Sequence, residues 1–228
     1  MPAGFALYTD QGVMQIDSNF KTATPAFKLS YTGPYTADGN TTFIGSWYQF
    51  TITVPTDVKY LFFSSAVDRS IGLFKKSGTS HTFRTTAQGT IDVYGFKDAP
   101  AQASPNRSGL QLFDANGVLT FDSDSNFMKI ANAFTVPTSG VRVDAWPVAG
   151  RKYAVGLGVY PKQWRGAAQA GRPWGVFMSY CVRVGPTSGG GGYTAIASRP
   201  WGGAGDPTPS NTPQASPPTA MTVDVNGL

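Results

Sequence analysis

The side chains able to perform chemistry are few, and the only histidine, His81, is the first to consider. A Ser-His-Asp or Cys-His centre would have to use this residue, and no nucleophile-elbow motif surrounds it. The only cysteine, Cys181, lies in an apolar strand-like run, where a lone thiol is usually a core residue. The sequence therefore predicts no enzyme, and we assign no catalytic residue.

Carboxylates could bind a metal ion or hydrolyse a glycosidic bond. The string Asp122–Asn126 begins like a calcium loop, but Phe127 and Ala133 occupy the positions where such a loop needs Gly and Glu. We interpret it as a solvated turn and predict neither metal nor cofactor. Because 13 Asp and Glu are available, a paired-carboxylate glycosidase stays open as the least favoured alternative.

Tryptophan and arginine gather in the Gly/Ala-rich segment 161–174, which we predict to be a long loop. These residue types are enriched at binding hot spots and stack on sugars or on partner side chains. Partner contact, capping of the core and glycan binding all remain open for them. The predicted partner-binding residues are Trp164, Arg165, Arg172, Trp174, Trp201, Pro207, Pro209 and Pro213.

Two further segments have unusual composition. Residues 206–218 contain five prolines in thirteen positions, so they cannot form a central strand. We predict an extended arm that lies over a surface or a neighbour. The run Gly189–Gly192 lacks the Lys-Ser/Thr of a phosphate-binding loop, and we predict a flexible hairpin tip.

Composition indicates the elements that must position these residues. The chain of 228 residues is 41% apolar and 13% aromatic but only 14% charged, with 27 Gly and 17 Pro. No stretch of ten residues shows the helical spacing of apolar positions, whereas alternating or continuous β-rich runs recur. The sequence therefore predicts an all-β fold of short strands joined by tight turns.

An internal repeat organises the chain. Residues 4–18 align without gaps with residues 109–123, with six identities, and each copy places Gly in a tight hairpin turn. Two further matches follow in the same order, Lys59-Tyr60 with Lys152-Tyr153 and 90–96 with 222–228. Matches at the start, middle and end indicate an internal duplication.

The repeat predicts two tandem antiparallel β-sandwich modules, jelly-roll or Ig-like, of six to eight strands each. We place the first module at residues 1–97, a linker at 98–108 and the second module at 109–228. The strands expected are Thr42–Val54, Lys59–Ala66, Ile71–Lys75, Gly89–Tyr94, Phe127–Val136, Lys152–Tyr160, Gly175–Val184, Tyr193–Ser198 and Met221–Val225.

Charge and hydropathy restrict the partners. The net charge of +5 is spread over scattered Lys and Arg, so we expect no nucleic-acid partner. No apolar run approaches the roughly 20 residues that span a bilayer, so we expect no membrane insertion. The N-terminal residues lack signal-peptide features, and we expect synthesis and folding in a bacterial cytoplasm.

The repeat unit Gly109–Ser123 resembles a family of small tail proteins from siphophages, often encoded beside the central fibre protein. The resemblance implies a structural role in the virion at the tail tip or fibre, in several copies or as a homo-oligomer, with other phage tail proteins as partners. The alternative is a carbohydrate- or receptor-binding module of the tail that contacts a host-surface glycan, and an envelope glycosidase is less favoured.

Overall fold

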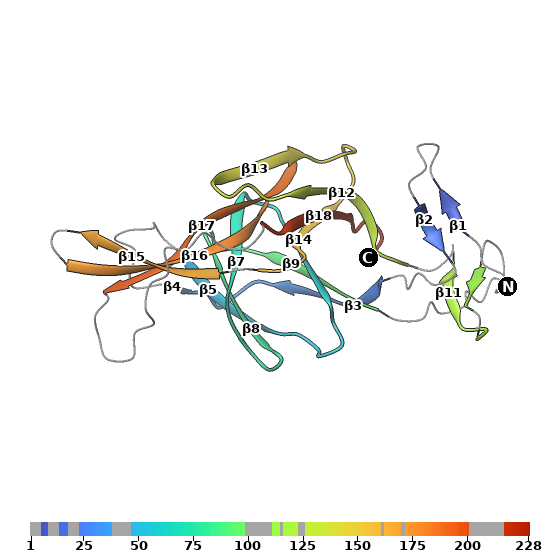
Figure 1. Ribbon diagram of the computed structural model, residues 1–228, viewed down its shortest axis with the longest axis horizontal. Coiled ribbons are helices and arrows are strands. Elements are labelled where there is room, and N and C mark those ends of the chain that lie inside the picture. Colours follow the sequence, from blue (N-terminus) through green and yellow to red (C-terminus); the bar gives the residue numbers. More distant parts are fainter. Residues whose placement is uncertain are drawn as a thin grey trace.

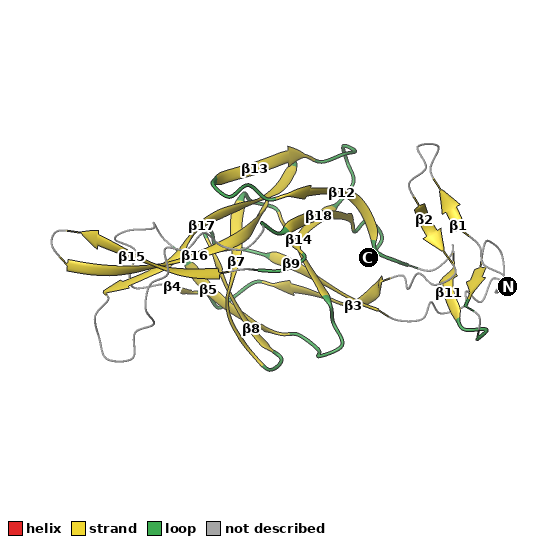
Figure 2. Cartoon of the chain, viewed as in Figure 1, coloured by secondary structure: helices red, strands yellow, loops and turns green. Residues whose placement is uncertain are grey.

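The computed structural model describes residues 6–8, 14–17, 23–37, 47–98, 111–114, 116–122, 126–160, 162–169, 172–200 and 217–228. Every regular element in these ranges is a β-strand, which confirms the predicted all-β class (Figure 2). Within the same ranges, no helix has the length and apolar character needed to cross a membrane.

The strands divide into two successive groups along the chain. Residues before the predicted linker form β1 (Ala6–Tyr8), β2 (Met14–Asp17), β3 (Ala23–Tyr31), β4 (Thr36–Ala37), β5 (Tyr48–Thr53), β6 (Tyr60–Ser65), β7 (Arg69–Ser77), β8 (Ser80–Thr85) and β9 (Ile91–Asp98). Later residues form β10 (Gln111–Phe113), β11 (Leu119–Asp122), β12 (Lys129–Thr135), β13 (Gly140–Ala145), β14 (Tyr153–Leu157), β15 (Lys162–Gln169), β16 (Arg172–Val184), β17 (Ser188–Pro200) and β18 (Thr219–Asp224).

Two large antiparallel sheets contain strands from both groups (Figure 1). Sheet I has the order β12-β18-β14-β6-β9-β3. Sheet II has the order β13-β17-β16-β7-β8-β5-β4, and β15 also pairs with β16. The hairpins β1–β2 and β10–β11 form separate two-stranded sheets, drawn at one end of the molecule.

The larger of two hydrophobic clusters in the described residues lies between sheets I and II, and the smaller one is formed by residues of sheet I such as Phe62, Phe96 and Val223. In β5, Phe50 and Ile52 are buried while the alternate residues are more exposed, as a strand with one covered face requires. Phe83 of β8 packs against Phe50 and Phe63, with ring centroids 5.4 and 5.1 Å away. The later group adds Val155 and other residues to this cluster. Each fully buried Phe contributes about 1.5–3 kcal/mol to folding.

The strand order is the same in the two groups. The first group contributes β3-β9-β6 to sheet I and β5-β8-β7 to sheet II, and the second contributes β12-β18-β14 and β13-β17-β16. The groups meet where β6 pairs with β14 and where β7 pairs with β16. Residues assigned to the two predicted modules therefore share both sheets, and the module boundaries stay a prediction.

The first two of the three sequence matches fall at corresponding places in the structure. Gly117 has a φ of 77° in the turn between β10 and β11, as predicted, and Asp114 Oδ1 accepts the N–H groups of Asn116 and Val118 there. Lys59-Tyr60 and Lys152-Tyr153 both lie at strand starts, those of β6 and β14.

The segments 90–96 and 222–228, which match in sequence, do not occupy equivalent positions in the two strand ladders. Asp92 lies opposite Ser64 near the end of β6, whereas Asp224 lies opposite Tyr153 at the start of β14. Similar strand sequences thus occupy different steps of the two ladders.

Two predicted loops are strands. Gly189–Gly192 is no flexible tip, because it forms the buried beginning of β17, paired with β13 and β16. Only glycine fits there, since a Cβ at Gly190 would collide with the main-chain oxygen of Arg142. Most of the predicted loop 161–174 belongs to the antiparallel hairpin β15–β16. Pairing of the two strands gives their backbone N–H and C=O groups partners, although the segment has few β-forming side chains.

Candidate functional site

A cleft of about 670 Å³ opens where the two groups of strands meet. Its walls come from the end of β6, the start of β9, the segment before β14 and the turn between β16 and β17. Six of its lining residues carry most of the polar and aromatic groups: Ser65, Asp92, Trp146, Arg151, Lys152 and Asn226. We name it the junction cleft.

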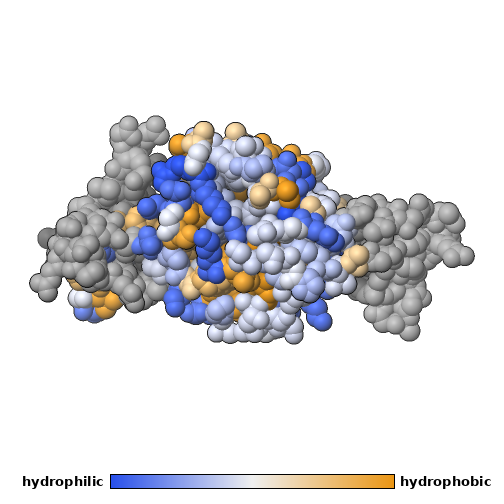
Figure 3. All heavy atoms as spheres, turned by 180° about the vertical axis from the view of Figure 1, so that it is seen from behind, coloured by the Kyte–Doolittle hydropathy of each residue, from blue (hydrophilic) through white to orange (hydrophobic). Residues whose placement is uncertain are grey.

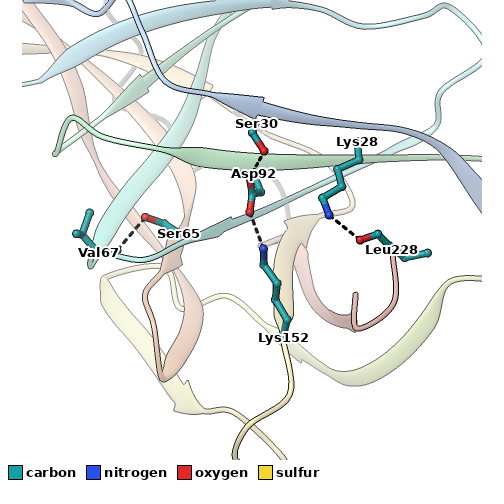
Figure 4. Close-up of polar contacts among 7 residues, drawn as sticks. All are labelled: Lys28, Ser30, Ser65, Val67, Asp92, Lys152 and Leu228. Atoms are coloured by element: carbon teal, nitrogen blue, oxygen red, sulfur yellow. Dashed lines mark hydrogen bonds and ion pairs between the residues drawn. The ribbon is translucent and has the colours of Figure 1, made fainter.

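An ion pair that joins the two groups forms one wall of the junction cleft (Figure 4). Lys152 Nζ donates to Asp92 Oδ2 at 2.6 Å, and Ser30 Oγ donates to Asp92 Oδ1 at 2.5 Å. Burial alone would raise the pKa of Asp92, but the hydrogen bonds from Lys152 and Ser30 and the Lys152 charge outweigh it and lower the pKa. Asp92 is therefore ionised and is unsuited to be a general acid.

A second ion pair and an aromatic pair border the same cleft. Arg151 Nη2 lies 2.7 Å from Asp224 Oδ2. Trp146 packs against Tyr153, with ring centroids 5.6 Å apart. Trp146 Nε1 donates to the main-chain oxygen of Pro186 at 3.1 Å, which fixes the indole. Hydroxyls, an amide, paired charges and an aromatic side chain together suit a polar, uncharged ligand better than an ion.

The strand β13 forms an edge of sheet II, along the outside of the molecule (Figure 1). Among the strands described it pairs only with β17, and Val141 and Val143 are 50% and 47% exposed. Arg142 and Asp144 form an ion pair of 3.1 Å within the strand. An edge strand with exposed valines can bind another strand, because its outer N–H and C=O groups have no partner in the sheet.

Exposed hydrophobic residues also occur away from this edge. Figure 3 shows hydrophobic residues on the described part of one face in small groups that hydrophilic residues interrupt. Large hydrophobic residues that are exposed include Ile130 of β12 and Val148, which follows β13. These residues belong to the same stretch of chain as Val141 and Val143.

The residues first considered for chemistry do not come together. His81 in β8 is 8% exposed and packs near Phe83, and burial first, then the charge of Lys76, lowers its pKa. Cys181 in β16 is fully buried, and burial raises the pKa of its thiol to about 12. In the part of the chain that the structure describes, no three His, Cys, Asp or Glu side chains group as metal ligands. Residues 123–125 of the calcium-like string lie outside it.

The predicted partner-binding residues fall on strands or outside the described residues. Trp164 and Arg165 belong to β15, and Arg172 and Trp174 belong to β16. The hairpin register places Trp164 opposite Phe177 and Trp174 opposite Ala167. The remaining four predicted residues, which are Trp201, Pro207, Pro209 and Pro213, lie outside the described part, so their role stays a prediction.

Comparison of the chain with protein-family models, with curated proteins and with solved structures finds no match in any of the three. Sequence reasoning missed the junction cleft, because Asp92 and Lys152 are 60 positions apart. Their proximity could have been inferred only from the pairing of β6 with β14.

Proposed function

We propose that this chain is a structural protein of a bacteriophage tail, at the tail tip or beside a fibre, that acts by assembly with other tail proteins and not by catalysis. The observation that supports this proposal most is the open edge of sheet II at β13. An exposed sheet edge can add a strand from another protein through main-chain hydrogen bonds. The resemblance of Gly109–Ser123 to small tail proteins favours a virion as the place of assembly.

We propose further that the chain arose by duplication of one sandwich-like module. Both groups of strands follow the same order in sheets I and II, which supports a common origin. The bond from Val54 N to Thr79 O after β5 has a counterpart from Trp146 N to Thr187 O after β13. Such a duplicated module fits a tail, where proteins are assembled in symmetric copies.

Purified particles of the phage that encodes this chain test the proposed function. Mass spectrometry of the particles should detect the chain, and an antibody against it should label the tail in negative-stain images. Cross-linking should join it to other tail proteins. Absence of the chain from purified particles would show that the proposal is wrong.

The junction cleft favours a second function, binding of a neutral saccharide on the host surface. Trp146, the hydroxyl groups of the lining residues Ser65 and Thr187, and the amide of Asn226 match the apolar faces and hydroxyls of a sugar. The charges of Asp92 and Lys152 neutralise each other, so the cleft has little preference for an anion. In this alternative the chain would be a receptor-binding module of the tail.

A glycan array distinguishes the two places where a sugar could bind. We expect Thr187→Ala with Asn226→Ala to reduce binding at least tenfold if the junction cleft is the site, since each lost hydrogen bond is worth about 1 kcal/mol. Trp174→Ala would abolish it if the β15–β16 hairpin is the site. Thr138→Ala, at an exposed position that does not line the cleft, is the control. Absence of binding to any glycan excludes this function.

A further inference from the structure

We infer that the partner of the β13 edge is a second copy of this chain, bound antiparallel about a two-fold axis at Val143. The inference deepens the proposed function, on which it rests, by naming the partner of the same open edge. Three features of β13 support it: the direction of its main-chain groups, its charges and the exposure of its valines.

The main-chain groups of β13 point alternately toward β17 and toward the free edge. Ala145 lies opposite Ser188, and the N–H of the next residue, Trp146, donates to Thr187 O at 3.0 Å. Hydrogen-bonded and non-bonded pairs alternate along an antiparallel ladder. Residues 140, 142 and 144 therefore direct their N–H and C=O groups toward β17. Val141, Val143 and Ala145 direct theirs outward, to the free edge.

The charges of β13 favour one register for a pair of these strands. The outward residues must lie opposite one another in a pair of β13 strands, and a two-fold axis at position 142, 143 or 144 brings at least two of these three residues opposite each other. An axis at 142 would place Arg142 opposite its own copy, and an axis at 144 would do the same for Asp144. Like charges directly opposite are destabilising. Only the axis at Val143 places Arg142 opposite Asp144 of the second copy.

This register makes the strand complementary to itself. Val143 forms a hydrogen-bonded pair with Val143 of the second copy, and Val141 forms one with Ala145 in both directions. Arg142 and Asp144 fall in non-hydrogen-bonded pairs, where the side chains of opposite residues lie closest. Their side chains are 48% and 32% exposed, so each can reach a second copy while it keeps its contact with Phe134 or Asn132 of its own chain. The same patch on both copies closes a dimer.

The strand has only part of the usual protection of an edge, because its charged residues Arg142 and Asp144 contact Phe134 and Asn132 of β12. Strand β13 contains no Pro and no Lys, and its valines are about half-exposed. In the first group of strands, the corresponding edge strand β5 is paired with β4. A six-residue interface is small, so we expect dissociation constants in the micromolar to millimolar range, which repeated copies in an assembly would strengthen.

Charge variants in pairs test this inference by sedimentation velocity up to about 1 mM protein. Arg142→Asp or Asp144→Arg alone should weaken self-association about tenfold, because two attractive pairs become repulsive. An equal mixture of the two variants should form heterodimers, since each acidic strand then faces a basic one. Both variants lack the ion pair within their own strand, so recovery in the mixture must come from contacts across the interface.

Two further variants complete the test. The doubly exchanged chain, Arg142→Asp with Asp144→Arg, should associate like the wild type. Val143→Pro should remain folded, since its lost N–H points away from β17, but should be monomeric. A wild-type chain that stays monomeric, or a mixture that associates no better than its components, would overturn the inference. Cross-links to other tail proteins in particles would still support the proposed function in that case.

Discussion

The carboxylate of Asp92 connects distant parts of the chain, because it accepts hydrogen bonds from Ser30 in β3 and from Lys152 before β14. Its pKa is lower in the folded chain than in the unfolded chain, so its contribution to stability is complete above about pH 4. The contribution is lost as the pH falls through the folded pKa. Burial disfavours the Lys152 cation, but the interactions with Asp92 and Tyr94 outweigh burial and raise the pKa of Lys152. The contribution of Lys152 to stability is therefore lost only at high pH.

Asp92→Asn is therefore expected to lower the free energy of unfolding at pH 7 by about 1 kcal/mol, a modest value because Lys152 is half-exposed and water screens the pair. Urea denaturation between pH 7 and pH 2 should also show a shallower loss of stability in acid than in the wild type. Asp57→Asn removes the exposed pair with Lys97 and is the control. Identical acid profiles for Asp92→Asn and the wild type would contradict this role.

The thiol of Cys181 is predicted to be unreactive in the folded protein. Burial raises its pKa to about 12, although the charge of Arg183 and a hydrogen bond with Ser70 oppose the shift. The reactive thiolate is therefore scarce at pH 8, and the sulfur is inaccessible. A chromogenic disulfide reagent should label no thiol in the native chain and one thiol after unfolding. Rapid native labelling would show that β16 is less well covered than described.

At the scale of elements, β17 depends on residues that look like a loop in the sequence. A Cβ at Gly190 would collide with the main-chain oxygen of Arg142, so this glycine allows β13 and β17 to lie side by side. Glycine runs carry no strand signal, because glycine is conformationally permissive and has no side chain to show alternation. Other strands were missed for similar reasons: β8 contains one large apolar residue, Phe83, and β3 contains Pro25.

Gly190→Ala is expected to destabilise the fold by about 2 kcal/mol, because the backbone of β13 must move to admit the methyl group. Gly158→Ala is the matched control, since a Cβ there would have Thr219 O as its nearest neighbour at 3.8 Å. Chemical denaturation of both variants measures the difference. Equal stability of the two variants would mean that β13 does not pack as closely on β17 as described.

For the whole molecule, sheets I and II pass through both predicted modules. Val155 of β14 pairs with Phe63 of β6, and Arg183 of β16 donates to Ser70 of β7 at 2.9 Å. Both groups of strands also contribute to one hydrophobic cluster. The described β-strands of sheets I and II are thus expected to unfold as one cooperative unit.

Residues 1–97 and 109–228, produced separately, are therefore expected not to fold alone, because each would expose its part of the shared core and two unpaired edges. Produced together, the two fragments should associate and recover the far-ultraviolet dichroism of the intact chain. Dichroism and thermal unfolding of each fragment provide the measurement. A sharp unfolding transition in an isolated fragment would show that each module folds independently.

The sequence alone determined the all-β class, most strand positions and the glycine turn at Gly117, because these depend on neighbours within a few residues. The tertiary structure decided which strands meet. Main-chain donors and acceptors are the same on every strand, so no local pattern specifies that β6 pairs with β14 or β7 with β16. The junction cleft, the Asp92–Lys152 pair and the open edge of β13 follow from those long-range pairings.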